Sequence, residues 1–580
     1  MADLRINRAV MALRLALIYA WLTILAPLAG SDTYYSVYLL VAVLALACGW
    51  KECPARRTRK KEWAVWGLAA FLSLTVVLAN YALLEPWDTL ESKASALVLL
   101  AGGICVAYPI IRRVAFTFPV TVAPGGKACP AWVFGGSFLF IALVDLGYLF
   151  GVKYPGILTR DSLSTVMQIL GMTEPNNVMP YWHTRLVGVF FQLGMWLTGD
   201  INGAVATFHV AQILMMAACL AYGVVTIHQL GAPAWVQLGL LGFCALVPYN
   251  IAYSVTLWKD VPFAGALLLR TVAGVRILAG IGKKQWGTWL LMLLGAVGFS
   301  LLRTNGWYAF AVTVAVVLLS GKDMRKRMGR SMLAVLLGTW FLLNPMLDIL
   351  QIGGMEPAEA FAVPMQQVAR VVSQGSELEE EERQLLGEIF DLEQMAVQYT
   401  PGTVDPVKFN TFRYDKEPYI RENWWAYVRL YLRLGLRYPG TYFKAWVEET
   451  KGYWNAGYAG YIWDNGCEGE NLGIIQSGAS PLAQRAYGLL FRAWEKTTGV
   501  QFTAAIGLFV WTLILLFAVC LLQDRREAIL FVPLLVLAVG LWLGTPVYAE
   551  FRYGYPFALC APFLLCACAY RQAEDTGSAP

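Results

Sequence analysis

The chain has 580 residues, of which 58% are hydrophobic and only 14% charged, and its mean hydropathy is +0.53. Soluble proteins carry charges on about a quarter of their residues. This composition therefore excludes an ordinary soluble protein and predicts a chain embedded in a lipid bilayer. The net charge of +6 matters less than the position of the charges, and we expect no nucleic-acid partner. The 22 Trp residues suit a protein with many membrane–water interfaces.

Apolar runs long enough to cross about 30 Å of hydrocarbon at about 1.5 Å per residue recur along the chain. The first run follows Arg5 and Arg8, as a signal peptide would. A second run follows at once, so we expect the first to be retained. About fourteen transmembrane helices are predicted, at residues 9–28, 35–50, 63–84, 94–111, 132–152, 204–227, 234–256, 261–280, 286–302, 307–319, 332–350, 504–522, 529–543 and 555–569.

The basic loops set the expected orientation, because Lys and Arg accumulate on the cytoplasmic side of membrane proteins. The apolar stretch Arg185–Thr198 is short, and we expect it to lie at the outer surface without crossing. Both termini are then cytoplasmic. With this orientation every basic loop falls in the cytoplasm, namely residues 51–61, 112–127, 283–284, 322–330 and 525–526.

Two long segments are then expected outside the cytoplasm. Helical spacing in ENWWAYVRLYLRLGL and GTYFKAWVEETKGYW predicts a mostly α extracytoplasmic domain, and the acidic run Glu377–Glu382 predicts a solvated helix face. The predicted fold is an all-α polytopic membrane protein. Its predicted parts are residues 1–130 with about four spans, a core at 131–350 with an external loop at 153–203, an extracytoplasmic domain at 351–503, and 504–580 with about three spans.

Five short polar motifs each lie where a span meets the external side. Snorkelling cations and an aromatic belt would explain any one of them alone. Asp161 and Asp260 fit that explanation less well, because carboxylates gain little at the interface. Since the predicted topology puts all five motifs on one face, they can converge on one cavity, and ionisable groups at membrane depth are functional candidates. The motifs are YPGILTRDS at 154–162, PYWHT at 180–184, WKD at 258–260, RTNG at 303–306 and EFRY at 550–553.

Two carboxylates beside a histidine and several cations suit group transfer from a phosphate-linked donor. A carboxylate can deprotonate an incoming hydroxyl, and cations can stabilise the phosphate as it leaves. Arg offers phosphate a planar pair of donors, and Lys acts as a point charge. The side chains in question are Asp161, Asp260, His183, Lys259, Arg303 and Arg552.

These motifs resemble those of the GT-C superfamily of integral membrane glycosyltransferases, which includes protein O-mannosyltransferases and lipid A aminoarabinose transferases. Such enzymes carry an acidic residue in the first large external loop, here Asp161. A Pro/His element follows it, here Pro180 to Thr184, and a second acidic residue opens a later span, here Asp260. The closing EFRYGYP at 550–556 is similar to the RY–P element of many bacterial members.

The resemblance covers about Trp132 to the end, and the chain looks closest to an uncharacterised bacterial branch with KD, RxNG and EFRY elements. Three features depart from the pattern. The His motif reads His-Thr instead of His-Pro-Pro, no DxD or WWD-type signature occurs, and four extra spans precede the external loop. The resemblance therefore does not identify the donor sugar or the acceptor.

The resemblance implies a GT-C-like bundle in a bacterial plasma membrane with an extracytoplasmic active site. It implies inverting transfer of a sugar from a polyprenyl-phosphate-linked donor to a glycan, lipid or protein acceptor. Asp161 would be the base or would orient the acceptor, and Asp260 would assist it or help to hold a divalent cation, the one candidate cofactor. Lys259, Arg303 and Arg552 would bind the donor phosphate, supported by His183, Asn305, Glu550 and Tyr553. Apart from the resemblance, the aromatic rings of Trp454, Tyr458 and Trp463 are candidate sugar contacts, and a domain core or a membrane-facing surface explains them equally well.

Other functions stay open at this point. A transporter or flippase for a lipid-linked glycan would place its site near the bilayer midplane, often between two repeated halves. Here the charges gather at one face and no repeat is visible. A glycan polymerase or ligase of another fold would also use Arg and His on the outer face, but the paired acidic residues favour the GT-C interpretation. The converging charges count against a non-catalytic scaffold.

Overall fold

A computed structural model describes residues 2–28, 35–48, 58–123, 130–281, 285–322, 325–353, 361–458, 460, 466–477, 480–497 and 502–572. Over these residues the chain is helical apart from loops, isolated bridges and one parallel pair of short strands, β1 (Thr121–Ala123) and β2 (Tyr570–Gln572). The protein is thus an all-α membrane protein, as its composition predicts.

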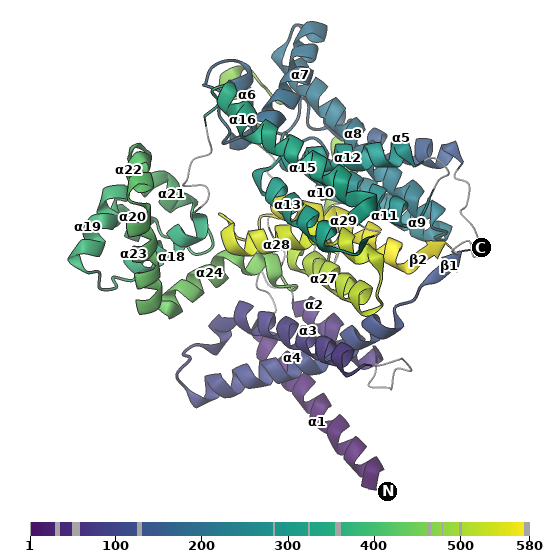
Figure 1. Cartoon of the computed structure of the whole chain (residues 1–580), viewed down its shortest axis with the longest axis vertical. Helices are drawn as coiled ribbons and strands as arrows, with labels where there is room; N and C mark the ends of the chain where they lie inside the picture. Colours follow the sequence, from purple (N-terminus) through teal and green to yellow (C-terminus); the bar gives the residue numbers. More distant parts are fainter. Residues whose placement is uncertain are drawn as a thin grey trace.

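The first four helices form a unit with its own small core, drawn in purple and blue at the bottom of Figure 1. Trp21 of α1 packs at the edge of Tyr38 of α2, and both are buried. The Tyr38 hydroxyl donates a hydrogen bond of 2.9 Å to Asn455, which ties this unit to the rest of the molecule. The helices are α1 (Ala2–Leu25), α2 (Tyr35–Cys48), α3 (Arg59–Ala79) and α4 (Leu90–Thr117).

The main bundle surrounds α11 (Asp260–Leu278), which is buried along most of its length and packs against α8, α12 and α29. Helices α9 and α10 form a pair bent by 51°, since Pro248 begins α10 and cannot continue α9. The other members are α5 (Ala131–Gly151), α8 (Ile201–Gln229), α9 (Ala234–Leu246), α10 (Pro248–Ser254), α12 (Trp286–Leu301), α13 (Thr304–Leu319), the π-helical turn η3 (Arg325–Gly329), α15 (Arg330–Leu343), α16 (Pro345–Ile349), α27 (Ile506–Leu522), the short 3-10 helix η6 (Arg526–Leu530), α28 (Val532–Gly544) and α29 (Phe551–Ala569).

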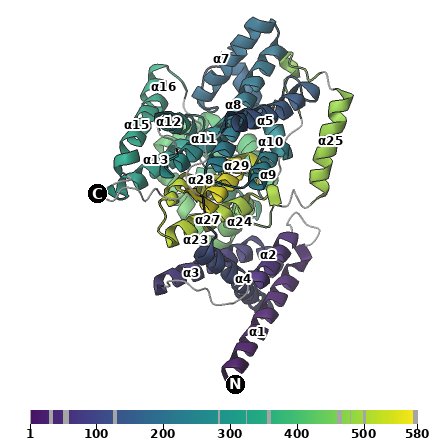
Figure 2. The ribbon, with the colours of Figure 1, turned by 90° about the vertical axis from the view of Figure 1, so that its right-hand side faces the viewer.

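The predicted extracytoplasmic domain consists of helices around a second apolar core (Figure 1, green). One residue of its acidic run is not solvated: Glu382 is buried and pairs with Arg437 at 2.8 Å. Helix α25 (Pro481–Lys496) lies apart at the edge of the molecule, where Tyr487 donates to the Val144 carbonyl of α5 (Figure 2). The domain helices are α18 (Ala362–Ser373), α19 (Glu380–Ile389), α20 (Leu392–Gln398), α21 (Asp405–Thr411), α22 (Glu417–Glu422), α23 (Trp424–Arg437) and α24 (Pro439–Trp454).

Eight helices of the described chain are long and apolar enough to cross a membrane, or nine if the bent pair is one span. Five shorter apolar helices accompany them: α2, α12, α13, α27 and α28. Each predicted span coincides with one of these elements, but the number of fourteen crossings stays a prediction. Helix α7 (Tyr181–Thr198), predicted to lie at the surface, is not among the eight.

The two ends of the bundle differ in charge. The start of α3 meets the end of α27, where Lys61 pairs with Asp524 at 3.0 Å. The end of α29 is at the same place, because Arg525 donates to the Cys568 carbonyl. Lys322, which follows α13, lines the same cavity as Arg525 and Arg526. The basic segments that begin α3 and follow α13 and α27 therefore gather at one end. Asp260, Arg303 and Arg552 lie at the opposite ends of α11, α13 and α29.

Gly306 allows α13 to fold closely back on α12. A Cβ atom at this position would lie 2.0 Å from the Phe299 carbonyl oxygen and 2.7 Å from the Phe263 ring. We expect Gly306→Ala to lower the thermal unfolding midpoint in detergent, at a cost of about 1–3 kcal/mol, because backbone cannot yield to the added methyl group. Gly287→Ala in α12 is the control, since a Cβ there meets nothing within 4 Å. Equal midpoints for the two variants would contradict this packing.

Candidate functional site

Two loops far apart in the sequence are joined by backbone hydrogen bonds beside α6 (Arg160–Ile169). The Ile157 amide donates to the Val255 carbonyl at 2.7 Å, and the Leu257 amide donates to the Ile157 carbonyl at 3.1 Å. Gly156 lets the first of these loops pass close to α8, since a Cβ on it would lie 2.1 Å from the ring of His209. The loop that carries Asp161 is thereby held against the loop that carries Asp260.

Side chains reinforce this junction. The Ser162 hydroxyl accepts the Thr159 amide, which begins α6 with a capping box, and donates to the Leu257 carbonyl at 2.8 Å. The indole of Trp258 donates to the Thr159 hydroxyl at 2.9 Å. Since Asp161 lies between Thr159 and Ser162, its position relative to Trp258 is well determined.

Asp260 is the first residue of α11, where the helix dipole favours a carboxylate. Its side chain is only 1% exposed, and Arg303 lies 2.6 Å from it. Arg303 precedes α13, and its guanidinium lies over the Tyr553 ring at 4.6 Å. Removing Arg303 would leave a buried carboxylate without its partner, which costs about 3–5 kcal/mol in comparable cases.

Arg552 lies between two carboxylates. One guanidinium nitrogen donates to Asp161 at 2.6 Å, and Nε lies 2.5 Å from Glu550. The cation also lies over the Trp258 and Tyr553 rings, at 5.3 and 5.0 Å. The first turn of α29 is therefore tied to α6 and to the start of α11.

The backbone before Glu550 is strained and firmly held. Ala549 has φ +55°, a left-handed conformation that costs a residue with a Cβ about 1 kcal/mol. The Tyr453 hydroxyl donates to the Val547 carbonyl at 2.6 Å and accepts the Glu550 amide at 3.2 Å. Strain of this kind persists where neighbouring groups enforce it, often at functional sites.

Lys259 and His183 complete the cluster. The Lys259 amine contacts the Met179 sulfur at 3.5 Å. Burial lowers the pKa of Lys259, while the nearby carboxylates Asp161 and Asp260 oppose the shift. Burial and the adjacent Lys259 lower the pKa of His183 to about 3, so this imidazole is neutral at ordinary pH. Neither of its ring nitrogens has a hydrogen-bond partner in the described part of the chain.

The two carboxyls beside Arg552 differ in acidity. Burial raises the pKa of Asp161, but Arg552, Lys259 and Lys408 outweigh it, and the net pKa lies below the ordinary value. Burial raises the pKa of Glu550 above its ordinary value, and its neighbours Asp260 and Asp161 raise it further against the effect of Arg552. Neighbouring carboxyls whose pKa values differ in this way can take different roles in proton transfer.

The domain at 361–454 also reaches the cluster. Lys408 of α21 is buried and acts on Asp161 electrostatically. The Arg160 guanidinium lies 5.2 Å from the centre of the Phe409 ring. The Val404 amide donates to the Pro546 carbonyl, and the Tyr548 amide donates to the Gly402 carbonyl, directly before Glu550. The domain is thus attached to the segment that positions Glu550.

The structure brings together seven of the residues singled out from the sequence, and His183 lies beside them. Glu550 was given only a supporting role, although its environment sets it apart. The sequence alone does not place Lys408 or Tyr453 at the cluster. A single Lys in a polar domain and a Tyr at a helix end have no sequence pattern that indicates a functional site. The seven are Asp161, Lys259, Asp260, Arg303, Glu550, Arg552 and Tyr553.

Other candidates lie elsewhere. Asn305 is exposed in the first turn of α13. Trp454 is only 3% exposed and stacks on Trp446, and Tyr458 is buried against Tyr548. Their rings pack in the protein interior, which favours a domain core over a sugar-stacking platform. Trp463 lies outside the described residues.

The residues do not fit a protein-held divalent cation. Within the described chain, no three His, Cys, Asp or Glu side chains are grouped closely enough to hold a metal ion. The nearest partners of Asp161 and Asp260 are arginines.

Comparisons with known proteins give one match. A family model described as "Family of unknown function (DUF6020)" matches residues 172–579, which include every residue of the cluster except Asp161. No curated protein and no solved structure matches the chain.

The lowered pKa of His183 should make the stability of the protein depend on pH. Its pKa is about 3 in the folded protein and about 6.5 in an unfolded chain. Because the unfolded state binds the proton more tightly, the stability present above pH 6.5 is lost as the pH falls toward 3. At pH 5 the loss is about 2 kcal/mol.

We therefore expect His183→Gln to lose less stability than the parent protein between pH 7.5 and pH 5, by about 2 kcal/mol. Denaturant titrations in detergent at the two pH values measure the difference. His209 and His228 are present in both proteins, so their contributions cancel. Identical pH dependence in the two proteins would contradict the buried, neutral His183.

Proposed function

Because the family match covers more than half of the chain, the protein belongs to the DUF6020 family, and we propose that it is a membrane glycosyltransferase of the GT-C type. It transfers a sugar from a polyprenyl-phosphate-linked donor to a glycan, lipid or protein acceptor outside the cytoplasm. The observation that carries this proposal is the convergence of three carboxylates and three cations at one end of the membrane helices.

The arrangement of the cluster suits a substrate that comes from the lipid phase. Asp161 is 35% exposed and lies at the accessible side, whereas Asp260 is 1% exposed and lies deep. Lys259 has no carboxylate oxygen within ion-pair distance in the described chain, so its charge is available to an anionic ligand. A lipid-linked phosphate supplies that anion and keeps its prenyl chain among the apolar helices.

In the reaction, an acceptor hydroxyl attacks the anomeric carbon of the donor sugar. The new C–O bond forms as the bond between the anomeric carbon and the phosphate oxygen breaks, with inversion at that carbon. The hydroxyl proton passes to a carboxylate, and the bonding electrons leave with the polyprenyl phosphate. Lys259, Arg303 and Arg552 stabilise the charge that develops on the leaving phosphate.

Asp161 and Glu550 share the proton chemistry in this proposal. Asp161 is ionised throughout and orients the acceptor hydroxyl, which a carboxylate of low pKa does well. Glu550 has a raised pKa and is the better proton acceptor, since general bases work best when their pKa approaches the ambient pH. Arg552 contacts both carboxylates and couples them to the phosphate.

The proposed location is a bacterial plasma membrane, with the cluster on the outer side and both termini in the cytoplasm. The gathering of basic segments at the opposite end of the bundle supports this orientation. The position of the charges at one end of the helices also favours an enzyme over a transporter or flippase, whose site would lie near the midplane.

Asp161→Asn tests the proposal directly. We expect it to lower transfer from lipid-linked sugars by about 100-fold, because the acceptor hydroxyl loses the carboxylate that orients it. Arg552 keeps Glu550 as a partner, so the variant should insert and fold. The assay is transfer of radiolabelled sugar from a panel of polyprenyl-phosphate-linked donors by purified protein in liposomes.

Asp200→Asn is the matched control. Asp200 is exposed, caps α8 through the Gly203 amide, and can be replaced by Asn without loss of the cap. It should transfer at the parent rate. Full product formation by Asp161→Asn would remove this residue from the mechanism. Movement of the intact lipid-linked glycan across the liposome membrane with no transfer product would instead favour a flippase.

A further inference from the structure

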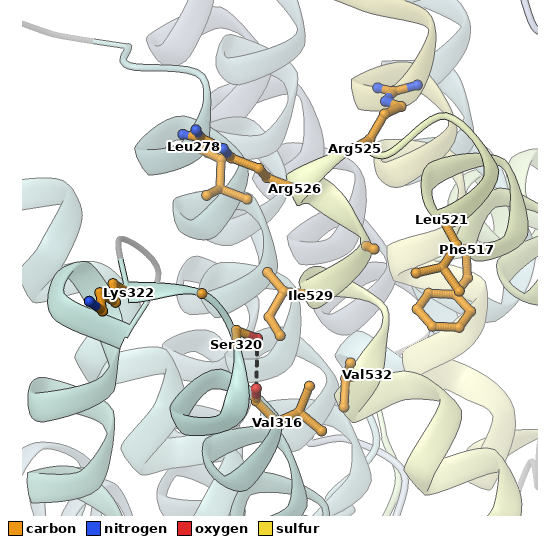
Figure 3. A pocket seen from close by; sticks show the side chains of 12 residues that line it. Leu278, Val316, Ser320, Lys322, Phe517, Leu521, Arg525, Arg526, Ile529 and Val532 are labelled. Atoms are coloured by element: carbon orange, nitrogen blue, oxygen red, sulfur yellow. Dashed lines mark hydrogen bonds between the residues drawn. The ribbon is translucent and has the colours of Figure 1, made fainter.

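A cavity of 590 Å³ lies at the basic end of the bundle, between α11, α13, η6, α27 and α28 (Figure 3). Leu278 ends α11 and Ser320 follows α13, so the cavity lies at the opposite ends of these helices from Asp260 and Arg303. The proposed transfer reaction does not use it. Its walls are mainly apolar, with side chains of Leu278, Val316, Phe517, Leu521, Ile529 and Val532.

Three cations line the same cavity: Lys322, Arg525 and Arg526 (Figure 3). Lys322 and Arg526 are exposed, and no carboxylate of the described chain pairs with either of them. Arg525 is buried, and it donates to the Cys568 carbonyl at 3.1 Å.

The carboxylate of Glu527, next to Arg526 in the sequence, is shared between Arg525 at 3.3 Å and Arg571 at 2.8 Å, and that of Asp524 pairs with Lys61. Glu527 is therefore already paired with two cations and cannot also neutralise Lys322 and Arg526. Within the described part of the chain, Lys322 and Arg526 at the edge of the cavity are therefore left without a carboxylate partner.

An apolar cavity with uncompensated cations at its edge suits an amphipathic anion. A water-soluble anion would leave the apolar walls in contact with water, which is unfavourable. A zwitterionic lipid would fill the walls but would bring its own cation to the same edge. An anionic phospholipid has apolar chains for the walls and a negative headgroup for the cations at the edge, and basic residues at the membrane surface attract such lipids.

We infer that this cavity binds an anionic phospholipid, with its phosphate against Lys322 and Arg526 and an acyl chain along Phe517, Leu521 and Val532. Arg525 stays bound to Cys568 and Glu527 and forms the floor beneath the headgroup. Because the lipid contacts α13 and α28, it braces two of the helices that lead to Arg303 and to Glu550. The site is independent of the proposed transfer reaction.

The test uses the purified full-length protein in an uncharged detergent. Phosphatidylglycerol, phosphatidylcholine and soluble glycerol phosphate are titrated separately, and bound ligand is measured by native mass spectrometry together with the thermal midpoint. We expect one phosphatidylglycerol per chain, bound at least about tenfold more tightly than phosphatidylcholine, and a raised midpoint. Glycerol phosphate should not bind in the same range.

Two variants localise the effect. Lys322→Gln with Arg526→Gln should weaken phosphatidylglycerol binding at least about tenfold, since two cations near the headgroup are lost. Lys60→Gln with Arg113→Gln is the matched control, because it removes two exposed cations at the same end but away from the cavity. It should leave binding within about twofold.

Val316→Phe fills the cavity without changing its charge and should also reduce lipid binding. Three outcomes would each overturn the inference. They are equal affinity for the two phospholipids, equal loss in both double variants, and binding of glycerol phosphate as strong as that of the lipid. The last result would identify a simple phosphate site.

Discussion

The candidate site depends on the ion pairs of Arg552 with Asp161 and Glu550. Taking a charge out of water near a membrane is costly unless partners replace the water. Asp161 and Glu550 supply those partners, and Trp258 and Tyr553 cover the guanidinium. These residues come from three separate parts of the chain. Pairing the Arg552 charge therefore brings together α6, the start of α11 and the start of α29.

The same network extends to the domain outside the bundle. Residues 402 and 404 bond to the segment just before Glu550, and Lys408 acts on Asp161. Tyr453, at the end of α24, holds the strained backbone at Ala549. The domain therefore contacts the cluster at the segment before Glu550 and beside Asp161.

The sequence predicts the membrane helices well, because apolar runs depend only on local composition. Charge placement also predicts that Asp161, Asp260, Arg303 and Arg552 share one end of the bundle, since the basic loops occupy the other. The ion pairs cannot be predicted from the local sequence, because Arg552 and Asp161 are 391 positions apart in the chain. At Trp454 the sequence leaves two interpretations open, because an exposed sugar platform and a buried aromatic core have the same local sequence. Only tertiary packing distinguishes them.

A double-mutant cycle between Asp161 and Arg552 tests this account most directly. Asp161→Asn, Arg552→Gln and the double variant are unfolded in detergent, and the coupling between the two positions is compared with that for Asp200 and Arg552. The account predicts a coupling free energy of at least about 1 kcal/mol for the first pair and less than about 0.5 kcal/mol for the second. Additive effects for Asp161 and Arg552 would mean that the two charges do not meet, and the cluster proposed as the active site would not exist.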